Sequence, residues 1–359
     1  MEKILVYGMT DTAGGMESYM MNMYRNIPKE KIQFDFVTDW ETMAYEDEVL
    51  KGGSVIHHIP KKSESIFGQI LAFAKILKNH KEYKKVYFNI MNAGSFLNMI
   101  APILFGRKII VHSHSAFHEN VRLHKIFKGV MNKFTSVKLA CSIGAAEHMF
   151  TKRDINKGNY TVVKNAIDVE KFIFDAQKRD EKRKELGIED KFAVLHVGRI
   201  VNAKNPIYLI NIFAELFKMK PDAVLLYAGV GNMESVVRAH AEKLGVSSSI
   251  MFLGERGDIP ELMCAADAFL LPSKFEGLPL VAVEAQTADL KCFFSDNFPK
   301  EEISLTDNVS FLSIDEPALA WAKEIANTTV GVRRNMSEEI TKHGFNIKYE
   351  ANKLLSAIE

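Results

Sequence analysis

Cysteine is scarce in this sequence, and the cysteines are far apart. Cys141, Cys264 and Cys292 are the only three in 359 residues, and no two of them form a CxxC pair. This spacing supports neither a disulfide framework nor a thiolate metal site, and it is typical of a protein in a reducing compartment. We therefore expect a cytoplasmic protein without disulfide bonds.

Long apolar runs are also lacking. The first apolar run, residues 4–7, stops at Gly8 and is too short for the apolar core of a signal peptide. The longest, residues 96–105, contains Asn98 and Pro102 and reaches only about half the length of a membrane-spanning helix. The sequence thus predicts neither export nor a transmembrane segment.

Proline is sparse as well, with 10 residues, and no low-complexity stretch interrupts the chain. Hydrophobic residues make up 47% of the sequence and charged residues 25%, a balance typical of a folded soluble protein. Because a single hydrophobic core seldom extends over 359 residues, we expect two domains with a ligand-binding cleft between them.

Acidic residues are rare in one long segment, residues 61–138. It holds 14 Lys and Arg but only 3 Asp and Glu, although the whole chain has a net charge of +1. Its stretch 63–85 places Ile66, Phe67 and Leu71 among lysines, which suits contact with anionic lipid on the inner face of the cell membrane. A solvated helical surface whose apolar side packs in the core explains the pattern equally well. Nucleic-acid binding is not expected, because no known motif accompanies the charge and aromatics are not interleaved for base stacking.

Short apolar strands alternate with helical patterns along the first half of the chain. KILVYG ends in a glycine turn, and the GGMESYMMNMYRNI that follows has its apolar residues at helical spacing. This alternation predicts a largely parallel sheet with helices on both faces. Further strands are expected in FDFVTD, VIHHI, KVYFNI, KIIVHSH, VKLACS and TVVKNAI, with helices at 66–79 and 98–105.

The same alternation starts again at FAVLHVGR, after a segment rich in lysine and glutamate at residues 175–190. We therefore expect an α/β protein with two Rossmann-like domains, residues 1–175 and residues 190–342. The amphipathic last segment, residues 343–359, is expected to pack back on the first domain. Helices of the second half are predicted at 206–219, 233–244, 259–265 and 280–288.

The most informative stretch is SKFEGLPLVAVEAQ, in which a strand ends and a loop leads into the next helix. Ligands of doubly wound sheets bind beyond the carboxyl ends of the strands, and a helix N-terminus favours an anion there. Glu276 lies in this loop with Gly277, Leu278 and Pro279, while Glu284 lies about a turn and a half into the helix. Both carboxylates can therefore approach one ligand. Alternatively, Glu276 could only interact favourably with the helix dipole, and Glu284 could be a solvated residue of the helix.

Two basic residues lie in the loop after the first strand of the same half, in HVGRIVNAKNP. Arg199 and Lys204 are expected at the same sheet edge as the two glutamates. Arginine binds a diphosphate through forked, bidentate hydrogen bonds, and lysine acts as a point charge. Without a metal, such a pair would stabilise a leaving nucleoside diphosphate as its bond breaks, although single loop cations are more often plain surface charges.

Glycine pairs mark two further loops that lead from a strand into a helix. Gly229 and Gly231 stand in YAGVGNME, and Gly14 and Gly15 follow the first strand. A lone GxG usually marks only a tight turn. Gly14 and Gly15 would let the backbone approach a substrate, because they have no side chain in the way.

Three histidines, His112, His114 and His118, lie at and just beyond the end of the strand KIIVHSH. A metal site is not favoured, because no HExxH is present, carboxylates are sparse and His118 already falls in a loop. His112 and His114 share one face of the strand. His114 suits a substrate-contacting or acid–base residue, since its strand end would face Glu276 across the cleft, and a purely structural histidine is the alternative.

Together these motifs make the chain resemble glycosyltransferase family 4 of the GT-B fold, and it looks closest to members that build bacterial exopolysaccharide or capsule. The resemblance runs nearly end to end, and it is most specific from Phe252 to Gln286. The stretches that carry it are GGMESYMMNMYRNI, KIIVHSHS, ACSIGAAEHMF, VVKNAIDVEKF, HVGRIVNAKNP, LLYAGVGNME, FLGERGDIPELMCAADAFLLPSKFEGLPLVAVEAQ and the tyrosine-containing C-terminal helix.

The resemblance implies a role for each matching residue. Arg199 and Lys204 would hold the donor diphosphate, Glu276 would meet the donor sugar, and Glu284 would accept hydrogen bonds from the ribose hydroxyls. His114 would be the family's histidine of the first domain, and a slip of two positions would make it His112. Further contacts would come from Gly277, Leu278 and Pro279 to the sugar and phosphates, from Gly229, Gly231, Asn232, Phe252, Leu253 and Gly254 around the base, and from Gly14 and Gly15 across the cleft.

The resemblance also implies a reaction. It is a retaining, metal-independent transfer of a sugar from a nucleotide-diphosphate sugar, with a UDP-sugar as the expected donor and no cofactor. The acceptor would be a glycan or a polyprenyl-diphosphate-linked molecule in exopolysaccharide or capsule synthesis. Two alternatives stay open. The region FEGLPLVAVEAQ speaks against a sugar-nucleotide epimerase of the same fold, and the joint presence of His114, Glu276, Arg199 and Lys204 speaks against a non-catalytic sugar-nucleotide-binding subunit.

The sequence departs from the family pattern after the second glutamate, where a Gly-x-Pro commonly follows. Ala288-Asp289-Leu290-Lys291 stands there, so Asp289 is expected to take the left-handed turn that ends the helix, which Asp tolerates better than most residues. The glycine pair often found next is replaced by residues 297–300. The departure falls at the donor-sugar end of the pocket that the resemblance implies.

Overall fold

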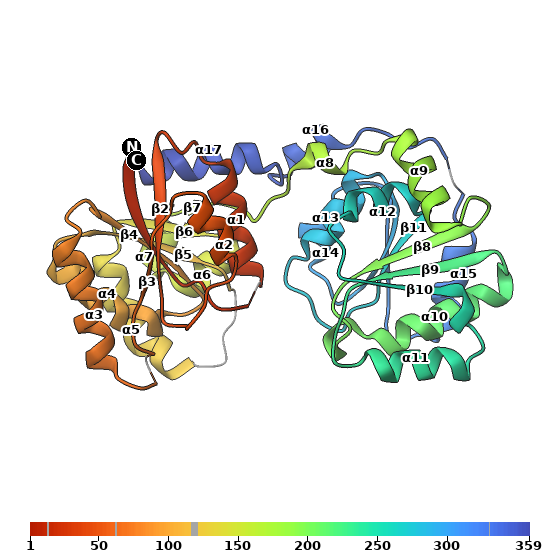
Figure 1. The fold of residues 1–359 in the computed structure, drawn as a ribbon, viewed down its shortest axis with the longest axis horizontal. Coiled ribbons are helices and arrows are strands. Elements are labelled where there is room, and N and C mark those ends of the chain that lie inside the picture. Colours follow the sequence, from red (N-terminus) through yellow and green to blue (C-terminus); the bar gives the residue numbers. More distant parts are fainter. Residues whose placement is uncertain (13, 62, 116–120, 330) are drawn as a thin grey trace. The chain divides into compact units, whose positions relative to one another are not determined.

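The chain forms two compact units in a computed structural model that describes residues 1–12, 14–61, 63–115, 121–329 and 331–359. Unit 1 combines Met1–Ala166 with the C-terminal Ile347–Glu359, and unit 2 is Ile167–Asn346 (Figure 1). Each unit has its own parallel sheet and its own buried core. The two expected Rossmann-like halves are therefore present.

Unit 1 contains a seven-stranded sheet in the order β3-β2-β1-β4-β5-β6-β7, and all of its strand pairs are parallel. Side chains that alternate along β1 enter two different cores, Ile4 and Val6 on one face and Leu5 on the other. The sheet is therefore buried on both faces, which is why its strands read as continuous apolar runs. The strands are β1 (Glu2–Tyr7), β2 (Ile32–Thr38), β3 (Ile56–His58), β4 (Lys85–Ile90), β5 (Lys108–Ser113), β6 (Val137–Ala140) and β7 (Thr161–Val162).

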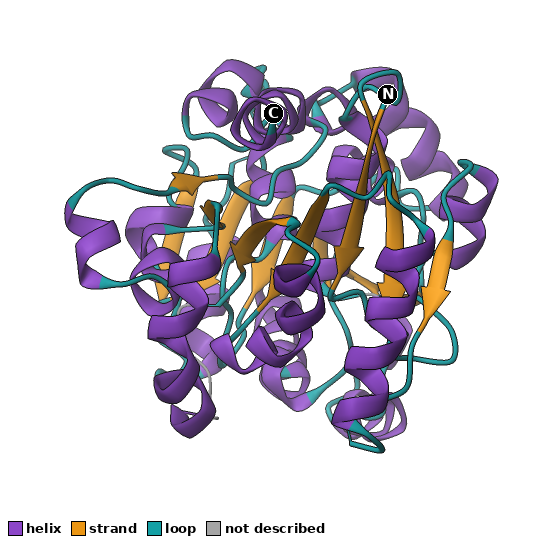
Figure 2. Ribbon diagram, turned by 90° about the vertical axis from the view of Figure 1, so that its left-hand side faces the viewer, coloured by secondary structure: helices purple, strands orange, loops and turns teal. Residues whose placement is uncertain are grey.

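Helices cover both faces of this sheet, as Figure 2 shows. The first core contains buried side chains of α1 and α17, and the second contains those of α3, α4, α5 and α6. Side-chain caps define where several of these helices begin. At the start of α3, for example, Ser65 Oγ accepts a hydrogen bond from Gly68 N at 2.9 Å. The helices are α1 (Gly15–Asn26), α2 (Glu46–Lys51), α3 (Ile66–Asn79), α4 (Phe96–Leu104), α5 (Val121–Phe134), α6 (Ile143–Met149), α7 (Lys152–Asn156) and α17 (Ile347–Ile358).

Unit 2 contains a six-stranded parallel sheet in the order β10-β9-β8-β11-β12-β13. Alternate residues of β8 again enter opposite cores, Ala193 and Leu195 one and Phe192 and Val194 the other. The order places β8 beside β11, although about 70 residues separate them. The strands are β8 (Phe192–Val197), β9 (Ala223–Ala228), β10 (Ile250–Gly254), β11 (Ala268–Leu271), β12 (Lys291–Ser295) and β13 (Val309–Leu312).

The helices of unit 2 also form two layers. Buried side chains of α8, α12, α13, α14 and α16 share one core, and those of α10, α11 and α15 share the other. These helices are α8 (Val169–Phe172), α9 (Ala176–Leu186), α10 (Pro206–Met219), α11 (Glu234–Lys243), α12 (Ile259–Ala265), α13 (Leu280–Thr287), α14 (Lys300–Ile303), α15 (Ala318–Ala326) and α16 (Ser337–Lys342).

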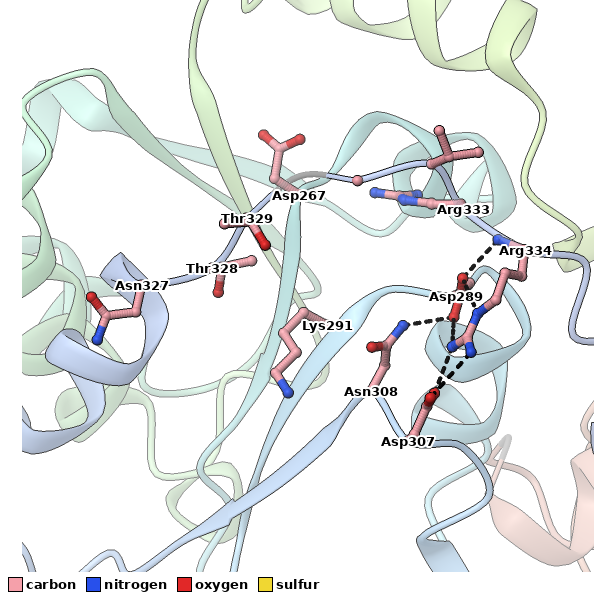
Figure 3. Close-up of a pocket in the computed structure, with 12 residues that line it drawn as sticks. Asp267, Asp289, Lys291, Asp307, Asn308, Asn327, Thr328, Thr329, Arg333 and Arg334 are labelled. Atoms are coloured by element: carbon pink, nitrogen blue, oxygen red, sulfur yellow. Dashed lines mark hydrogen bonds and ion pairs between the residues drawn. The ribbon is translucent and has the colours of Figure 1, made fainter.

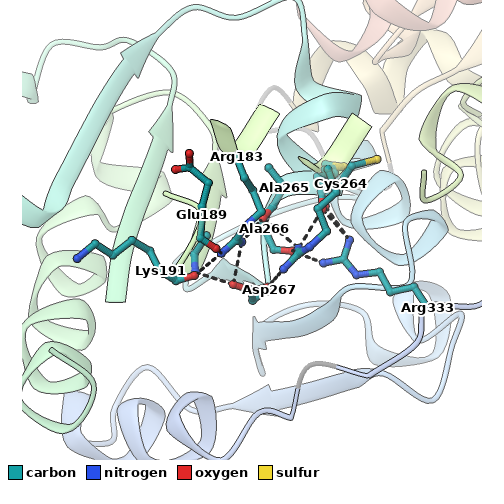
Figure 4. A network of polar contacts seen from close by, with 11 residues as sticks. Arg183, Glu189, Lys191, Cys264, Ala265, Ala266, Asp267 and Arg333 are labelled. Carbon is teal, nitrogen blue, oxygen red and sulfur yellow. Dashed lines mark hydrogen bonds and ion pairs between the residues drawn. The ribbon is translucent and has the colours of Figure 1, made fainter. Parts of the chain in front are cut away.

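The segment between the two halves belongs to unit 2, so the division falls at Ala166 and Ile167, earlier than the lysine-rich stretch suggests. A polar network attaches this segment to the rest of unit 2 (Figure 4). Asp267, just before β11, accepts hydrogen bonds from Arg179 at 2.5 Å and Arg183 at 3.2 Å, both on α9. The same guanidiniums bind the carbonyls that end α12, where cations are favoured. The highly charged α9 is therefore packed largely through its arginines, with Leu186 at its end against the core.

The C-terminal helix α17 lies beside α1 in unit 1 (Figure 1). Its Leu354 and Ile358 are at most 1% exposed, which explains the amphipathic pattern of the last segment. Lys85 Nζ, on β4, donates to Ile358 O at 2.6 Å and to Glu2 Oε2 at 2.8 Å, so the two chain ends share one cation. The residues of unit 1 at the C-terminus begin at Ile347 rather than at 343.

Asp289 ends α13 in the left-handed conformation, with φ of 51°, as the departure from the family pattern led us to expect. Its carboxylate is buried and accepts hydrogen bonds from Arg334 N at 2.7 Å and Asn308 Nδ2 at 2.6 Å (Figure 3). Arg334 also bridges to Asp307. These contacts hold a backbone conformation that is strained for most residues with a side chain.

Candidate functional site

The carboxyl edge of the unit 2 sheet brings together two loops that are distant in the sequence. Lys204, in the loop after β8, forms an ion pair with Oε1 of Glu276, in the loop after β11. Ser273 Oγ donates to the same carboxylate oxygen at 2.9 Å. The Lys204 and Glu276 side chains are only 19% and 12% exposed, so the pair is largely shielded from water. Shielding strengthens an ion pair relative to one at an open surface.

Backbone contacts hold these two loops against each other. Lys274 N donates to Ala203 O at 2.9 Å, and Asn205 Nδ2 donates to Pro272 O at 3.2 Å. Asn205 takes a left-handed conformation with φ of 55°, from which α10 begins with Pro206. The positions of Lys204 and Glu276 therefore follow from the pairing of β8 with β11 and from this turn.

Arg199 lies in the same loop as Lys204, but its side chain is exposed. It forms no ion pair with any residue that the structure describes. Of the four charged residues predicted at this edge, the structure thus pairs Lys204 with Glu276 and leaves Arg199 open to solvent.

Gly229 and Gly231 are required by close backbone packing against the Arg199 loop. A Cβ at Gly229 would lie 2.0 Å from Gly198 O, and one at Gly231 would lie 2.3 Å from Ile200 O. Gly229 also has φ of 144°. These contacts leave no room for a side chain, so both glycines serve to place the loop, with Asn232 following directly.

The loop before α13 leaves backbone free for a ligand. A Cβ at Gly277 would meet no atom within 4 Å, and Pro279 occupies the N-cap position, with Leu278 partly buried. Pro279 thus precedes the first helical residue, Leu280. The first turn of α13 offers unpaired backbone N–H groups, which favour a bound anion.

Glu284 lies on the second turn of α13 and is partly buried. Burial raises the pKa of its carboxyl group from 4.5 to about 7. Among the described residues, none forms a hydrogen bond or an ion pair with this carboxylate. A carboxylate without partners, close to a ligand-binding sheet edge, is an acceptor available to hydroxyl donors.

The end of β10 contributes an aromatic layer beside the β9 loop. The Phe252 ring stacks on Tyr227 with centroids 5.7 Å apart, and the Arg238 guanidinium lies over the same ring, 4.0 Å from its centroid. Leu253 is partly buried, and Gly254 O accepts from Gly229 N at 2.7 Å. The Phe252 ring therefore packs against the side chains of Tyr227 and Arg238.

At the carboxyl edge of the unit 1 sheet, Gly14 caps α1 and Gly15 begins it. The buried Glu17 closes this turn: its carboxylate accepts from Gly14 N at 3.2 Å and from Thr10 Oγ1 at 2.9 Å. Asn165 Nδ2 approaches Gly15 O at 3.5 Å. Sequence reasoning missed Glu17, although its place three residues after the N-cap is the signature of a capping box.

His112 and His114 lie on the same face of β5 and its extension, with ring centroids 4.3 Å apart. His112 is fully buried, and its Nδ1 shares a 2.5 Å hydrogen bond with the hydroxyl of Tyr87. Tyr19 contacts both rings, at 4.6 Å and 4.7 Å between centroids. His112 is thus held by core partners, which the sequence did not reveal. His118 lies outside the described residues.

His114 is the more accessible of the two histidines. Burial lowers its pKa to about 3, so its ring is neutral near pH 7. Its Nε2 has no hydrogen-bond partner among the residues that the structure describes. This Nε2 is itself buried, so a neutral imidazole could accept a hydrogen bond from a substrate hydroxyl there only once that atom is exposed.

Two other kinds of site come into question, a metal centre and a cavity away from Glu276. No group of three or more His, Cys, Asp or Glu side chains is arranged to hold a metal ion in the described part of the chain. A cavity of about 480 Å³ is lined by Asp289, Lys291 and Arg333, at the amino ends of the unit 2 strands (Figure 3). It therefore lies at the sheet edge opposite to Glu276.

Two family profiles match this chain. "Glycosyltransferase Family 4" matches residues 13–171, and "Glycosyl transferases group 1" matches residues 178–339. The first match covers β2 to β7 of unit 1, and the second covers all six strands of unit 2. The chain belongs to the family 4 glycosyltransferases of the GT-B fold.

Named relatives of this glycosyltransferase agree with that membership. EpsF of Bacillus subtilis (strain 168), which carries the name of a glycosyltransferase, is 28% identical over 96% of this chain and 92% of its own length. The UDP-Gal:alpha-D-GlcNAc-diphosphoundecaprenol alpha-1,3-galactosyltransferase of Escherichia coli is 29% identical over 63% of this chain and 61% of its own. The capsular polysaccharide biosynthesis glycosyltransferase CapH of Staphylococcus aureus is 22% identical over 87% of this chain and 86% of its own.

Solved structures show the same fold. The crystal structure of Anabaena Alr3699/HepE in complex with UDP and glucose superimposes with a TM-score of 0.78, at 18% identity. The match covers 100% of this glycosyltransferase and 99% of the Anabaena chain. The two-unit α/β architecture expected from the sequence is thereby established as GT-B.

Proposed function

We propose that this glycosyltransferase transfers the sugar of a UDP-sugar, with retention of configuration and without a metal ion, to a glycan or polyprenyl-diphosphate-linked acceptor of polysaccharide or capsule synthesis. The observation that carries the proposal is the shielded Lys204–Glu276 pair beside the start of α13. It places a cation, a carboxylate and free backbone N–H groups at one point of the sheet edge. A diphosphate and the sugar attached to it need these three groups together.

Each side chain then has a chemical task. Lys204 and the exposed Arg199 would neutralise the diphosphate as its bond to the anomeric carbon breaks. Glu276, oriented by Ser273, would hold Lys204 and accept hydrogen bonds from the sugar. Glu284 would accept from the ribose hydroxyls, because it is the carboxylate of this edge that lacks partners among the described residues.

In the proposed reaction the acceptor hydroxyl attacks the anomeric carbon from the face that the diphosphate leaves. One C–O bond breaks, one C–O bond forms, and the hydroxyl proton passes to the departing UDP. The configuration of the anomeric carbon is then kept. The free Nε2 of His114 would bind a substrate hydroxyl as a neutral imidazole.

The relatives' names and titles support the choice of substrates. The Escherichia coli enzyme is named for UDP-Gal and a diphosphoundecaprenol-linked acceptor, CapH for capsular polysaccharide, and the Anabaena protein was crystallised with UDP. A UDP-sugar and a lipid-linked glycan are thus the first substrates to test.

The function is tested by incubating the purified protein with each of several UDP-sugars, a lipid-linked sugar acceptor and EDTA. We expect transfer from one UDP-sugar and a product whose anomeric signal in NMR matches that of the donor. An inverted product would contradict retention, and loss of transfer in EDTA that added metal restores would contradict metal independence. Donor binding without transfer or donor hydrolysis would favour a non-catalytic subunit.

Changing Lys204 to Ala should lower kcat by roughly a hundredfold or more, because the leaving diphosphate loses a cation that is largely shielded from water. The matched control is Lys243→Ala, an exposed lysine at the end of α11, which should keep the wild-type rate. Steady-state kinetics on both variants checks this expectation. A wild-type kcat for Lys204→Ala would overturn the diphosphate assignment.

A further inference from the structure

The helices α3, α4 and α5 form one layer over one face of the unit 1 sheet, where their buried side chains share a core (Figure 1). Their opposite sides point away from the sheet and expose large apolar side chains. Phe67 is 82% exposed, Leu71 69% and Leu104 78%, values far above those of core residues. The exposed apolar side chains of this layer are Ile66, Phe67, Leu71, Leu104, Phe105, Ile126, Val130 and Phe134.

Helix α3 shows how the apolar pattern is divided. Phe73 and Leu77 are buried in the core, whereas Phe67 and Leu71 lie on the solvent side. The sequence left core packing and surface contact as equal explanations, and the structure assigns different residues to each. The exposed set needs an explanation of its own, because core packing does not account for it.

Basic residues share the outward side of the layer. On α3, Phe67, Leu71, Lys75 and Lys78 follow one another at helical spacing on one side. None of the cations on this side forms an ion pair with a described residue. We call the exposed apolar side chains and these cations the basic apolar face; its cations are Lys75, Lys78, Arg122, Lys125 and Lys133.

We propose that the basic apolar face binds the surface of an anionic lipid bilayer. Apolar side chains that project between lysines can enter the headgroup region, while the ammonium groups stay at the anionic phosphates. A second copy of the chain is disfavoured, because two such faces would bring like charges together. In the described part of residues 61–138, only Glu64 and Glu82 are acidic.

The face is also placed suitably for a lipid-linked acceptor. The strand β5 ends next to His114, and α5 begins only seven residues later at Val121. The α5 end of the face is therefore close in the chain to the sheet edge that carries His114. The proposal goes beyond the proposed function and does not need it, because bilayer binding is measured without donor or acceptor.

Co-sedimentation with vesicles tests the proposal. The full-length protein is mixed with vesicles of phosphatidylglycerol and phosphatidylcholine in equal parts, or of phosphatidylcholine alone. We expect binding to the anionic vesicles only, with a loss as salt is raised. The double variants Phe67→Ser/Leu71→Ser and Lys75→Glu/Lys78→Glu should each bind roughly tenfold more weakly or worse.

A matched control carries the same kinds of change on unit 2. Leu319 and Lys323 are exposed on α15, and the variant Leu319→Ser/Lys323→Glu should bind as the wild type does. Because all the changed side chains are exposed, thermal unfolding should show that each variant is folded. Absence of binding at low salt, or equal binding by all variants, would overturn the proposal. A dimer that Phe67→Ser/Leu71→Ser disrupts, without vesicle binding, would assign the face to a second copy instead.

Discussion

Two glutamates eight positions apart, Glu276 and Glu284, have opposite surroundings. Glu276 accepts from Lys204 and Ser273, whereas Glu284 has no partner among the described residues and its pKa rises to about 7. Both residues are glutamates, so the difference in their hydrogen-bond partners comes from the side chains that the fold places beside each. A paired carboxylate organises a site, and an unpaired one is available to a ligand.

Glu284→Gln should change how stability depends on pH. The pKa of Glu284 rises from 4.5 to about 7 on folding, so the folded protein holds an extra proton between these values and its free energy of unfolding falls as pH rises through them. Gln does not titrate. At pH 8 the variant should therefore be more stable than the wild type by on the order of 3 kcal/mol, and the difference should vanish near pH 4.

Chemical denaturation at a series of pH values measures this effect. The control is Glu301→Gln, at an exposed position of α14, which should keep the wild-type pH dependence. If Glu284→Gln follows the wild-type curve at all pH values, the carboxyl group is not desolvated in the folded protein. The same variant should bind UDP more weakly, because an amide is a poorer acceptor for two ribose hydroxyls than a carboxylate.

Among the elements, α13 shows how a departure from a family pattern is accommodated. Its end lacks the usual glycine, and Asp289 takes the left-handed conformation there. The carboxylate of Asp289 accepts hydrogen bonds from Arg334 and Asn308. The side chain therefore stabilises a turn in which the backbone of the same residue is strained. The structure thereby explains why this helix can end without glycine, although it assigns no sugar contact to the replaced segment at 297–300.

Asp289→Ala should destabilise unit 2 by roughly 3 kcal/mol, because it loses the hydrogen bonds of the carboxylate and keeps the left-handed strain. Asp289→Gly loses the same hydrogen bonds but tolerates the conformation, so it should be more stable than Asp289→Ala by about 1 kcal/mol. Urea denaturation compares the two variants. Equal stabilities would mean that the turn carries no strain.

At the scale of the whole molecule, the chain crosses twice between its two units. The first crossing is at Ala166 and Ile167, and the second returns the last 13 residues to unit 1 as Ile347–Glu359. Leu354 is buried in the unit 1 core, while Ile340, only 14 residues earlier, is buried in the unit 2 core. Neighbours in sequence therefore stabilise different cores.

This division predicts that Leu354→Ala and Ile340→Ala affect different unfolding transitions. Each change removes a fully buried side chain and should cost about 2–5 kcal/mol. In differential scanning calorimetry, Leu354→Ala should lower the transition of unit 1 and Ile340→Ala that of unit 2. Added UDP should raise only the transition that Ile340→Ala lowers. If both variants lower one common transition, the two units unfold together.

Much of the fold could be predicted from local pattern. Helices at 66–79, 206–219 and 259–265 have the predicted bounds, because their apolar spacing and start signals are local. The strands β12 and β13 were not predicted, since four or five apolar residues without alternation do not distinguish a strand from a buried helix. The division between the units was placed too late, because α9 reads as a linker until Asp267 supplies partners for its arginines.

The sequence by itself determined the family, the alternation of strands and helices, and which loops follow strands into helices. Only the tertiary structure decided which of these loops meet, because strand order is a long-range property: β8 lies beside β11, and so Lys204 meets Glu276. It also decided that Glu284 stays unpaired and that Phe67 and Leu71 face solvent while Phe73 is buried. The physical reason is the same in each case, since pairing and burial depend on neighbours that are distant along the chain.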